Sequence, residues 1–164
     1  MKGEIPMSHV KNPLLKDIVR SEWIDYNGHM TDSAYAAVFS IAVDQLMIEL
    51  GIDADFRDKY HYSIYTLETH LCYLAEAHEG QDLYVNIQLV DYDTKRLHVF
   101  FVMENDKGDH LATSEQMLMG MDMNEGRPAP FPTEIQSRVE TLGKAHANLP
   151  KPDHSGRKIG IRRK

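Results

Sequence analysis

Cysteine is almost missing from this sequence, because Cys72 is the only one among 164 residues. A single thiol cannot close an internal disulfide, and it cannot build a zinc site from several thiolates. Long apolar runs are missing too. The first ten residues, MKGEIPMSHV, contain no apolar signal core, and no stretch approaches the ~18 uncharged apolar residues that a membrane span needs. We therefore expect a cytoplasmic protein that does not enter a membrane.

Three common catalytic motifs are also absent. The sequence has no G-x-S-x-G nucleophile turn, no phosphate-binding G-x-x-x-x-G-K-[ST] and no dinucleotide-binding G-x-G-x-x-G. It has nine histidines, but no two of them stand four residues apart as in a helical zinc site. We expect no metal site, and we expect any chemistry to come from carboxylates, backbone amides and water.

The composition is that of a globular protein, with 42% hydrophobic and 26% charged residues. The pattern predicts one domain over residues 1–150 and a basic tail over 151–164. The tail has six Lys or Arg and one Asp, whereas the whole chain has a net charge of −7. The acidic body argues against a nucleic-acid groove, which needs a basic face. The tail is either a solvated terminus or an arm that contacts ligand phosphates or a neighbouring subunit.

The first half of the chain reads as a strand, a turn and one long helix. Residues 14–24 are rich in β-branched and aromatic side chains and predict a strand. Residues 25–30 form a turn, since Asn27-Gly28 is a strong turn signal. Either Thr31 or Asp32 is suited to cap a helix that runs to about residue 50, where Gly51 ends it. This helix is apolar nearly all round, which is typical of a central element.

The second half reads as four strands, at 62–77, 83–90, 96–103 and 110–123, then an extended exit at 126–132 and a helix over 133–146. Alternation in the first of these strands places five side chains on one face: Tyr65, Leu67, Thr69, Leu71 and Tyr73. In the last strand alternation aligns Met117, Met119, Met121 and Met123, which we expect to fill the core. The order predicts an α+β domain, with an antiparallel sheet of about five strands around one long helix. One helix leaves a sheet edge exposed, so we expect dimerisation.

Polar residues gather where the first strand meets the long helix. Asp25 ends the strand, and Gly28 lets the backbone turn closely. A helix N-terminus offers unpaired N–H groups that can stabilise a developing oxyanion, and a carboxylate beside them can attack a carbonyl or deprotonate water. The arrangement suits acyl transfer without serine. The simpler alternative is a strand-to-helix cap in which local amides stabilise Asp25.

The same stretch resembles the hotdog-fold acyl-CoA thioesterases of the 4-hydroxybenzoyl-CoA thioesterase type. Their signature is D-x-x-G-H-V-N-N-x-x-Y, and Asp25, Gly28, His29 and Tyr35 match it in register. Met-Thr-Asp replaces Val-Asn-Asn, which removes the amide side chain that the family has at position 31. The resemblance covers residues 14–132. It implies a hotdog fold, a homodimer or dimer of dimers, and active sites between protomers.

The resemblance also implies roles for particular residues. Asp25 is the expected nucleophile or general base, and the backbone N–H near Asp32 is expected to polarise the thioester carbonyl. His29 is expected to position the turn or the substrate. No cofactor is expected, since CoA is part of the substrate. The CoA phosphates are expected to meet the basic tail or the basic pair Lys95 and Arg96.

A narrower resemblance is to the thioesterases of carnitine breakdown, which act on betainyl-CoA. It rests on three stretches: EWIDYNGHMTDSAYAAVF, SIYTLETHLCYLAEAHEG and LATSEQMLMGMD. A trimethylammonium acyl group favours aromatic faces and negative charge. The residues expected to bind it, or to line the site beside it, are Trp23, Tyr26, Asn27, Thr31, Tyr35, Tyr62, Tyr65 and Glu68.

Three alternatives stay open at this point. The aromatic residues are equally compatible with an ordinary core. The chain is compatible with a generic short-chain or aryl-CoA thioesterase of the same fold, and with a hotdog protein that binds acyl-CoA without hydrolysing it. A hotdog dehydratase is disfavoured, because the G-D-x-N-P-x-H pattern is absent.

Overall fold

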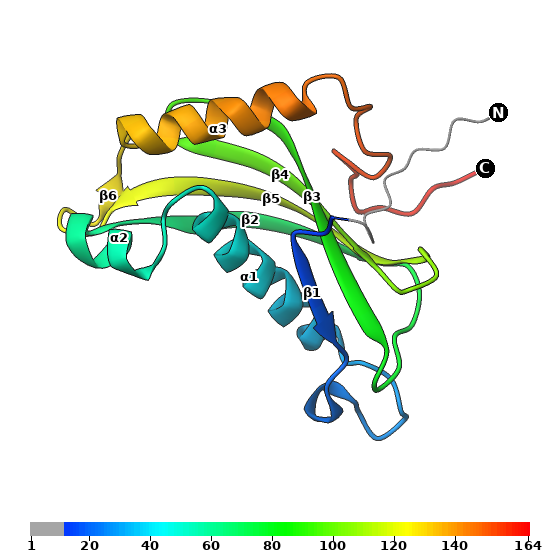
Figure 1. The fold of residues 1–164 in the computed structure, drawn as a ribbon. Helices are drawn as coiled ribbons and strands as arrows, with labels where there is room; N and C mark the ends of the chain where they lie inside the picture. The colour runs from blue at the N-terminus through cyan, green and yellow to red at the C-terminus, as the bar shows by residue number, and fades with distance from the viewer. Residues whose placement is uncertain (1–11) are drawn as a thin grey trace.

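The computed structural model describes residues 12–164. A curved antiparallel sheet wraps around the long helix α1 (Asp32–Glu49), as Figure 1 shows, in the strand order β1-β3-β4-β5-β2. The strands are β1 (Leu15–Ile18), β2 (Tyr62–Tyr73), β3 (Asp82–Tyr92), β4 (Arg96–Glu104), β5 (His110–Asp122) and the short β6 (Arg127–Pro128), which pairs with β5. The predicted α+β architecture is confirmed. Within the described residues no single helix is long and apolar enough to cross a bilayer.

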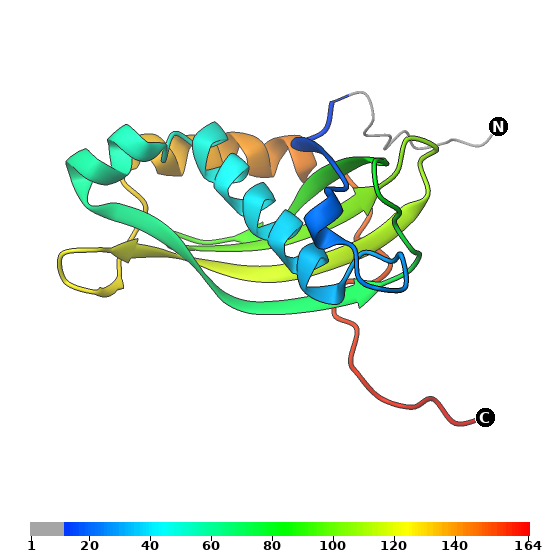
Figure 2. The ribbon, with the colours of Figure 1, turned by 90° about the horizontal axis from the view of Figure 1, so that it is seen from below.

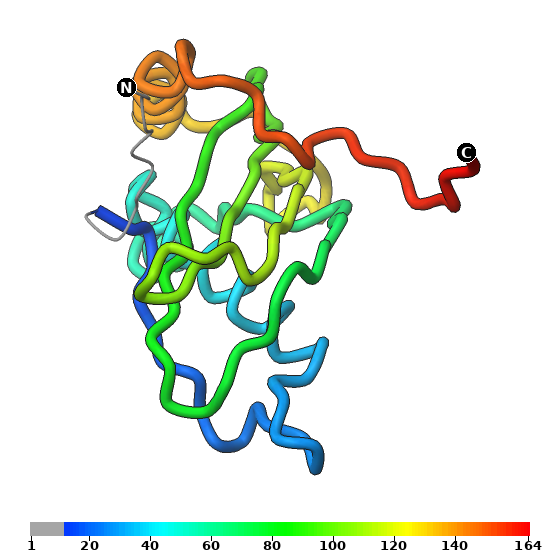
Figure 3. Tube along the Cα trace, turned by 90° about the vertical axis from the view of Figure 1, so that its right-hand side faces the viewer, coloured from blue at the N-terminus to red at the C-terminus, as the bar shows by residue number. Residues whose placement is uncertain are grey.

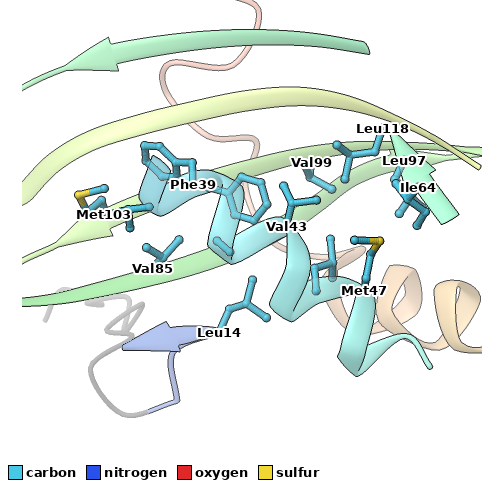
Figure 4. Packing of buried hydrophobic residues seen from close by; sticks show 14 of the residues in the cluster. Leu14, Phe39, Val43, Met47, Ile64, Val85, Leu97, Val99, Met103 and Leu118 are labelled. Atoms are coloured by element: carbon cyan, nitrogen blue, oxygen red, sulfur yellow. The ribbon is translucent and has the colours of Figure 1, made fainter. Parts of the chain in front are cut away.

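The core lies between α1 and the concave face of the sheet. Val38, Phe39 and Leu46 of α1 are at most 2% exposed, and they belong to one apolar cluster with residues of β3, β4 and β5 (Figure 4). The opposite side of α1 is exposed at Ala36, Ser40 and other positions. The helix is therefore central, as its composition predicts, but this chain covers only one of its sides.

Two local predictions differ from the structure. The first strand is shorter than residues 14–24, because β1 pairs with β3 only over Leu15–Ile18 and the chain then turns into the short helix η2 (Ser21–Trp23). The helix α2 (Ala54–Tyr60) was not predicted. Asp53 caps α2 by accepting a 2.8 Å hydrogen bond from the Phe56 N–H, and left-handed His61 ends it. A helix this short lacks the apolar period that sequence patterns detect.

A β-bulge in β2 makes the predicted alternation wrong. The pairing with β5 shifts between Thr66 and Glu68, so Leu67 is an extra residue on its strand. After the shift, Thr69, Leu71 and Tyr73 are paired with the buried β5 residues that face α1, whereas Tyr65 is paired with Met119 on the other face. The five residues predicted on one face are therefore divided between two.

The methionines of β5 share one face, as predicted, but that face is not the core. Ser114 and Leu118 of β5 are fully buried on the α1 side, and Met117, Met119 and Met121 alternate with such residues. They lie half-buried on the face opposite α1, called the outer face below. Met123 beyond them is 44% exposed. Alternation assigns side chains to a common face, but it does not say which face a helix covers.

The two edges of the sheet differ. The helix α3 (Thr133–His146) lies along β3, where β1 no longer pairs with it (Figure 1). His146 Nδ1 accepts a 2.9 Å hydrogen bond from the Leu89 N–H, and burial lowers the pKa of this histidine. The other edge, β2, pairs with no further strand of residues 12–164 on its outer side. An uncovered edge strand favours pairing with another chain.

Glu104 makes folding stability depend on pH. It is 4% exposed, and burial raises its pKa from 4.5 to about 7. The unfolded chain loses this proton at lower pH than the folded chain, so the stabilising contribution is lost as pH rises from 4.5 through 7. We expect Glu104→Gln to raise Tm at pH 8 and to change it little at pH 4. Thermal unfolding at both pH values measures this, and an equal shift from the exposed control Glu79→Gln would contradict it.

Candidate active site

The turn between β1 and α1 is built from backbone hydrogen bonds. The Asp25 N–H donates to the His29 carbonyl at 2.8 Å, and the Gly28 N–H donates to the Asp25 carbonyl at 3.0 Å. Gly28 has a φ of 81°, a conformation that a residue with a Cβ rarely adopts. An isolated bridge between Ile24 and Met30 closes the turn. The predicted Asn27-Gly28 turn is confirmed.

The Asp25 side chain is held through one oxygen. Its Oδ1 accepts hydrogen bonds from the N–H groups of Asn27 at 2.8 Å and His29 at 3.1 Å. Its Oδ2 makes no hydrogen bond within residues 12–164, and Asp25 lines an open pocket at the N-terminus of α1. The carboxylate is therefore oriented by the turn while one oxygen stays available.

The N-terminus of α1 lines the same pocket. Thr31 is the N-cap residue, but its side chain makes no capping hydrogen bond. The Asp32 carboxylate instead accepts a 2.8 Å bond from the Ser33 N–H. The Asp32 N–H makes no hydrogen bond within the described chain, and it belongs to the end of the helix that carries partial positive charge. This N–H is a suitable donor for a developing oxyanion.

The far wall of the pocket comes from the end of β2 and the residues after it, which sequence reasoning missed. They are Tyr73, Leu74, Ala75 and Glu76. Tyr35 ties this segment to α1, because its hydroxyl donates to the Ala75 carbonyl and accepts from the Ala77 N–H, both at 3.2 Å. The sequence pattern predicts a strand as far as residue 77, but the chain leaves the sheet after Tyr73. For this reason the sequence did not indicate that residues 74–76 line the pocket.

Two tyrosine rings meet in the pocket. Tyr35 and Tyr73 pack edge to face with 5.3 Å between ring centroids, and the Tyr73 hydroxyl donates to the Asp32 carbonyl at 3.4 Å. Burial raises the pKa of both phenols, and the Asp32 charge adds to the effect at Tyr73. Both rings therefore stay neutral at ordinary pH.

The charge of the pocket has one sign. Its lining includes the carboxylates Asp25, Asp32 and Glu76, and it includes no Lys or Arg among the described residues. His29 Nε2 lies 3.4 Å from the Glu76 carboxylate. A cationic ligand is favoured in such surroundings, and the aromatic faces add cation–π attraction.

Several predicted site residues lie outside this pocket. Trp23 packs under the Arg20 guanidinium at 4.5 Å, and Tyr26 is 96% exposed. Asn27 and Gly28 contribute backbone geometry through the turn. None of these four lines the pocket of its own chain.

Most of the remaining predicted residues lie toward the other end of β2, and Glu68 lies in its middle. The buried Tyr62 donates its hydroxyl to the Ala129 carbonyl at 3.0 Å. Tyr65 and Arg96 both pair with Met119 of β5, so these three residues lie next to one another across the sheet, on the same face. The pocket lies beside Tyr73, at the opposite end of the same strand. The remaining residues of this group are Glu68, after the bulge, and Lys95, in the β3–β4 turn.

Among residues 12–164, no group of three or more His, Cys, Asp or Glu side chains is placed to hold a metal ion. The expectation of a metal-free site stays a prediction.

Comparison with known proteins assigns the family. Residues 19–139 match the profile of the thioesterase-like superfamily. The chain belongs to this superfamily. This thioesterase-like protein is 45% identical over 144 residues to a betainyl-CoA thioesterase of Pseudomonas aeruginosa. The matched region covers 87% of this chain and 91% of the relative. It is 40% identical over 147 residues to the L-carnitine dehydrogenase/betainyl-CoA thioesterase of Rhizobium meliloti, a match that covers 88% of this chain and 29% of that longer protein.

Solved structures agree with the assignment. A hypothetical protein from Staphylococcus aureus in complex with CoA superposes with a TM-score of 0.86 at 32% identity, over 90% of this chain and 94% of that one. A putative thioesterase from Pseudomonas putida gives a TM-score of 0.80 at 34% identity, over 92% and 97% of the two chains. The hotdog fold implied by the sequence resemblance is confirmed.

Proposed function

We propose that this protein hydrolyses a short acyl-CoA thioester and that Asp25 performs the chemistry. The observation that carries the proposal is a carboxylate with one anchored and one available oxygen beside the unbonded Asp32 N–H. Oδ2 of Asp25 either attacks the thioester carbonyl, giving a mixed anhydride that water then hydrolyses to the free acid, or takes a proton from the water that attacks the carbonyl directly. The Asp32 N–H stabilises the oxyanion, and the CoA thiol leaves. No metal or bound cofactor takes part.

The proposed substrate is betainyl-CoA. Its acyl group carries a trimethylammonium cation, and the pocket combines three carboxylates with the rings of Tyr35 and Tyr73. The P. aeruginosa relative is named for the same thioester. A generic apolar acyl chain matches these surroundings less well, because the pocket lining is acidic. We also propose that the protein is cytoplasmic, as the sequence predicts.

Pairing of two copies through β2 would place one end of this strand beside the opposite end of the same strand in the second copy, so that both copies contribute to each site. Antiparallel pairing of β2 with β2 of a second copy places the Tyr62 end of one strand beside the Tyr73 end of the other. That arrangement brings Lys95, in the β3–β4 turn of one copy, toward the pocket of the other, whereas Tyr65 and Arg96 lie on the outer face of the sheet. It accounts for the predicted CoA contact of Lys95, which a single chain leaves at the wrong end of the strand.

We expect the protein to form at least a dimer. The physical reason is the uncovered β2 edge and the exposed side of α1. Light scattering at low micromolar concentration should give at least twice the mass of one chain. A stable monomer that retains full activity would remove the intersubunit site from the proposal.

Thiol release from a panel of acyl-CoAs tests the proposed function. The panel contains betainyl-CoA, short straight-chain acyl-CoAs and an aryl-CoA, and each is assayed with and without a chelator. Fastest release from betainyl-CoA, unaffected by the chelator, supports the proposal. Faster release from an apolar acyl-CoA identifies a generic thioesterase, and tight binding without any release identifies a non-catalytic acyl-CoA-binding protein.

A further inference from the structure

The C-terminal segment is anchored to the outer face of the sheet. The Gly156 N–H donates to Glu115 Oε1 at 2.7 Å, and the Ser155 hydroxyl donates to Oε2 at 2.8 Å. His98 Nε2 lies 2.6 Å from the same Oε2. Burial by itself raises the pKa of Glu115, but these hydrogen bonds and the His98 charge outweigh it and lower the pKa. Residues up to 156 are therefore not a free tail.

Beyond this anchor the chain leaves across the edge strand. Figures 2 and 3 show residues 157–164 running past β2, the uncovered edge of the sheet. Ile159 and Ile161 are 91% and 76% exposed. Two residues apart in an extended chain, they project to the same side. Five basic residues surround them, at positions 157, 158, 162, 163 and 164. An apolar pair flanked by basic residues in this way favours an apolar surface with a carboxylate beside it.

The outer face next to β2 is such a surface. Its methionine face, defined as Met117, Met119 and Met121, is half-buried and lies beside Tyr65, which is 43% exposed. The bulge residue Leu67 is 55% exposed, and exposed Glu68 supplies negative charge in the row of Met117. Scattered exposed apolar residues are common, but a contiguous group of this kind marks a contact surface.

The spacing between strands and the length of the C-terminal segment together show which subunit's methionine face residues 157–164 can reach. Strands lie ~4.8 Å apart, so across a β2–β2 pair the β5 of the second copy lies about 14 Å from the β5 that carries Glu115. Ile159 and Ile161 come three and five residues after Gly156. At ~3.3 Å per extended residue they reach about 10 and 16 Å from the anchor, which spans the second copy's β2 and β5.

We propose that residues 157–164 form an arm that packs Ile159 and Ile161 on the methionine face of the second subunit. The inference rests on the β2–β2 dimer described under the proposed function. The basic residues of the arm then lie near Glu68 of that subunit. The two-fold axis makes the exchange reciprocal, so each dimer contains two such contacts.

A disulfide cross-link tests which subunit the arm contacts. In a Cys72→Ala background, Ile161→Cys is combined with Met119→Cys, and each single cysteine variant is the control. We expect mild oxidation to give a dimer-sized band on a non-reducing gel from the double variant, several-fold stronger than from either control. Loss of free thiols at monomer size would place the arm on its own sheet and overturn the proposal.

Dimer stability supplies the second readout. Replacing both isoleucines by glutamate should raise the dimer dissociation constant at least tenfold, since two apolar side chains lose their burial, whereas the conservative Ile159→Val/Ile161→Val control should change it little. Glu115→Ala, which removes the anchor, should weaken the cross-link. An unchanged dissociation constant in a protein that is dimeric and hydrolyses acyl-CoA overturns the arm alone. A monomeric wild type overturns the dimer as well.

Discussion

Asp25→Asn should lower the turnover number at least ~100-fold while leaving the fold intact, the usual scale for losing a nucleophile or general base. Asparagine keeps an oxygen that can accept the Asn27 and His29 N–H bonds, so the turn is retained. What is lost is the available carboxylate oxygen. Steady-state thiol release gives the turnover number, and circular dichroism and Tm report the fold.

The matched control is Asp106→Asn, the same substitution in the exposed β4–β5 hairpin outside the pocket lining. It should retain the activity of the wild type. If Asp25→Asn also folds, binds substrate and turns over at a rate near the wild type, then Asp25 only caps the turn. In that case the reaction centre lies elsewhere.

Removing the charge of the acyl group should reduce catalytic efficiency by about 10- to 1000-fold, because cation–π contacts contribute ~0.5–2 kcal/mol each and the pocket carboxylates add to them. Betainyl-CoA and 3,3-dimethylbutyryl-CoA have nearly the same shape, but only the first is cationic. The pocket offers Tyr35, Tyr73 and three carboxylates to that charge. An apolar pocket reverses the order, since the neutral group costs less to desolvate. Comparing kcat/KM for the two thioesters measures the preference.

A variant locates the source of this preference. Tyr73→Leu removes one aromatic face and should reduce the ratio between the two substrates severalfold, while hydrolysis of the neutral thioester continues as an internal control. Equal or better hydrolysis of 3,3-dimethylbutyryl-CoA by the wild type would exclude betainyl-CoA as the intended substrate. It would leave acyl-CoA hydrolysis by Asp25 standing.

Features with local causes could be predicted from the sequence. The turn before α1 follows from Asn27-Gly28, and the end of that helix follows from Gly51, which has a φ of 93°. The helix over 133–146 begins directly after Pro132 and has the predicted bounds. Asp25 and the helix N-terminus lie only a few residues apart in the chain. Their meeting in one pocket is therefore a short-range event that the motif already contains.

The partners of a strand are set at long range, and the sequence alone did not determine them. The bulge at Leu67 depends on how β2 aligns with β5, and it moves Tyr65 to the outer face while Tyr73 faces the pocket. The same alignment assigns the β5 methionines to the outer face. Periodicity tells which side chains go together, because it follows from backbone geometry. Which face is buried is decided by what packs there, and only the tertiary structure contains that information.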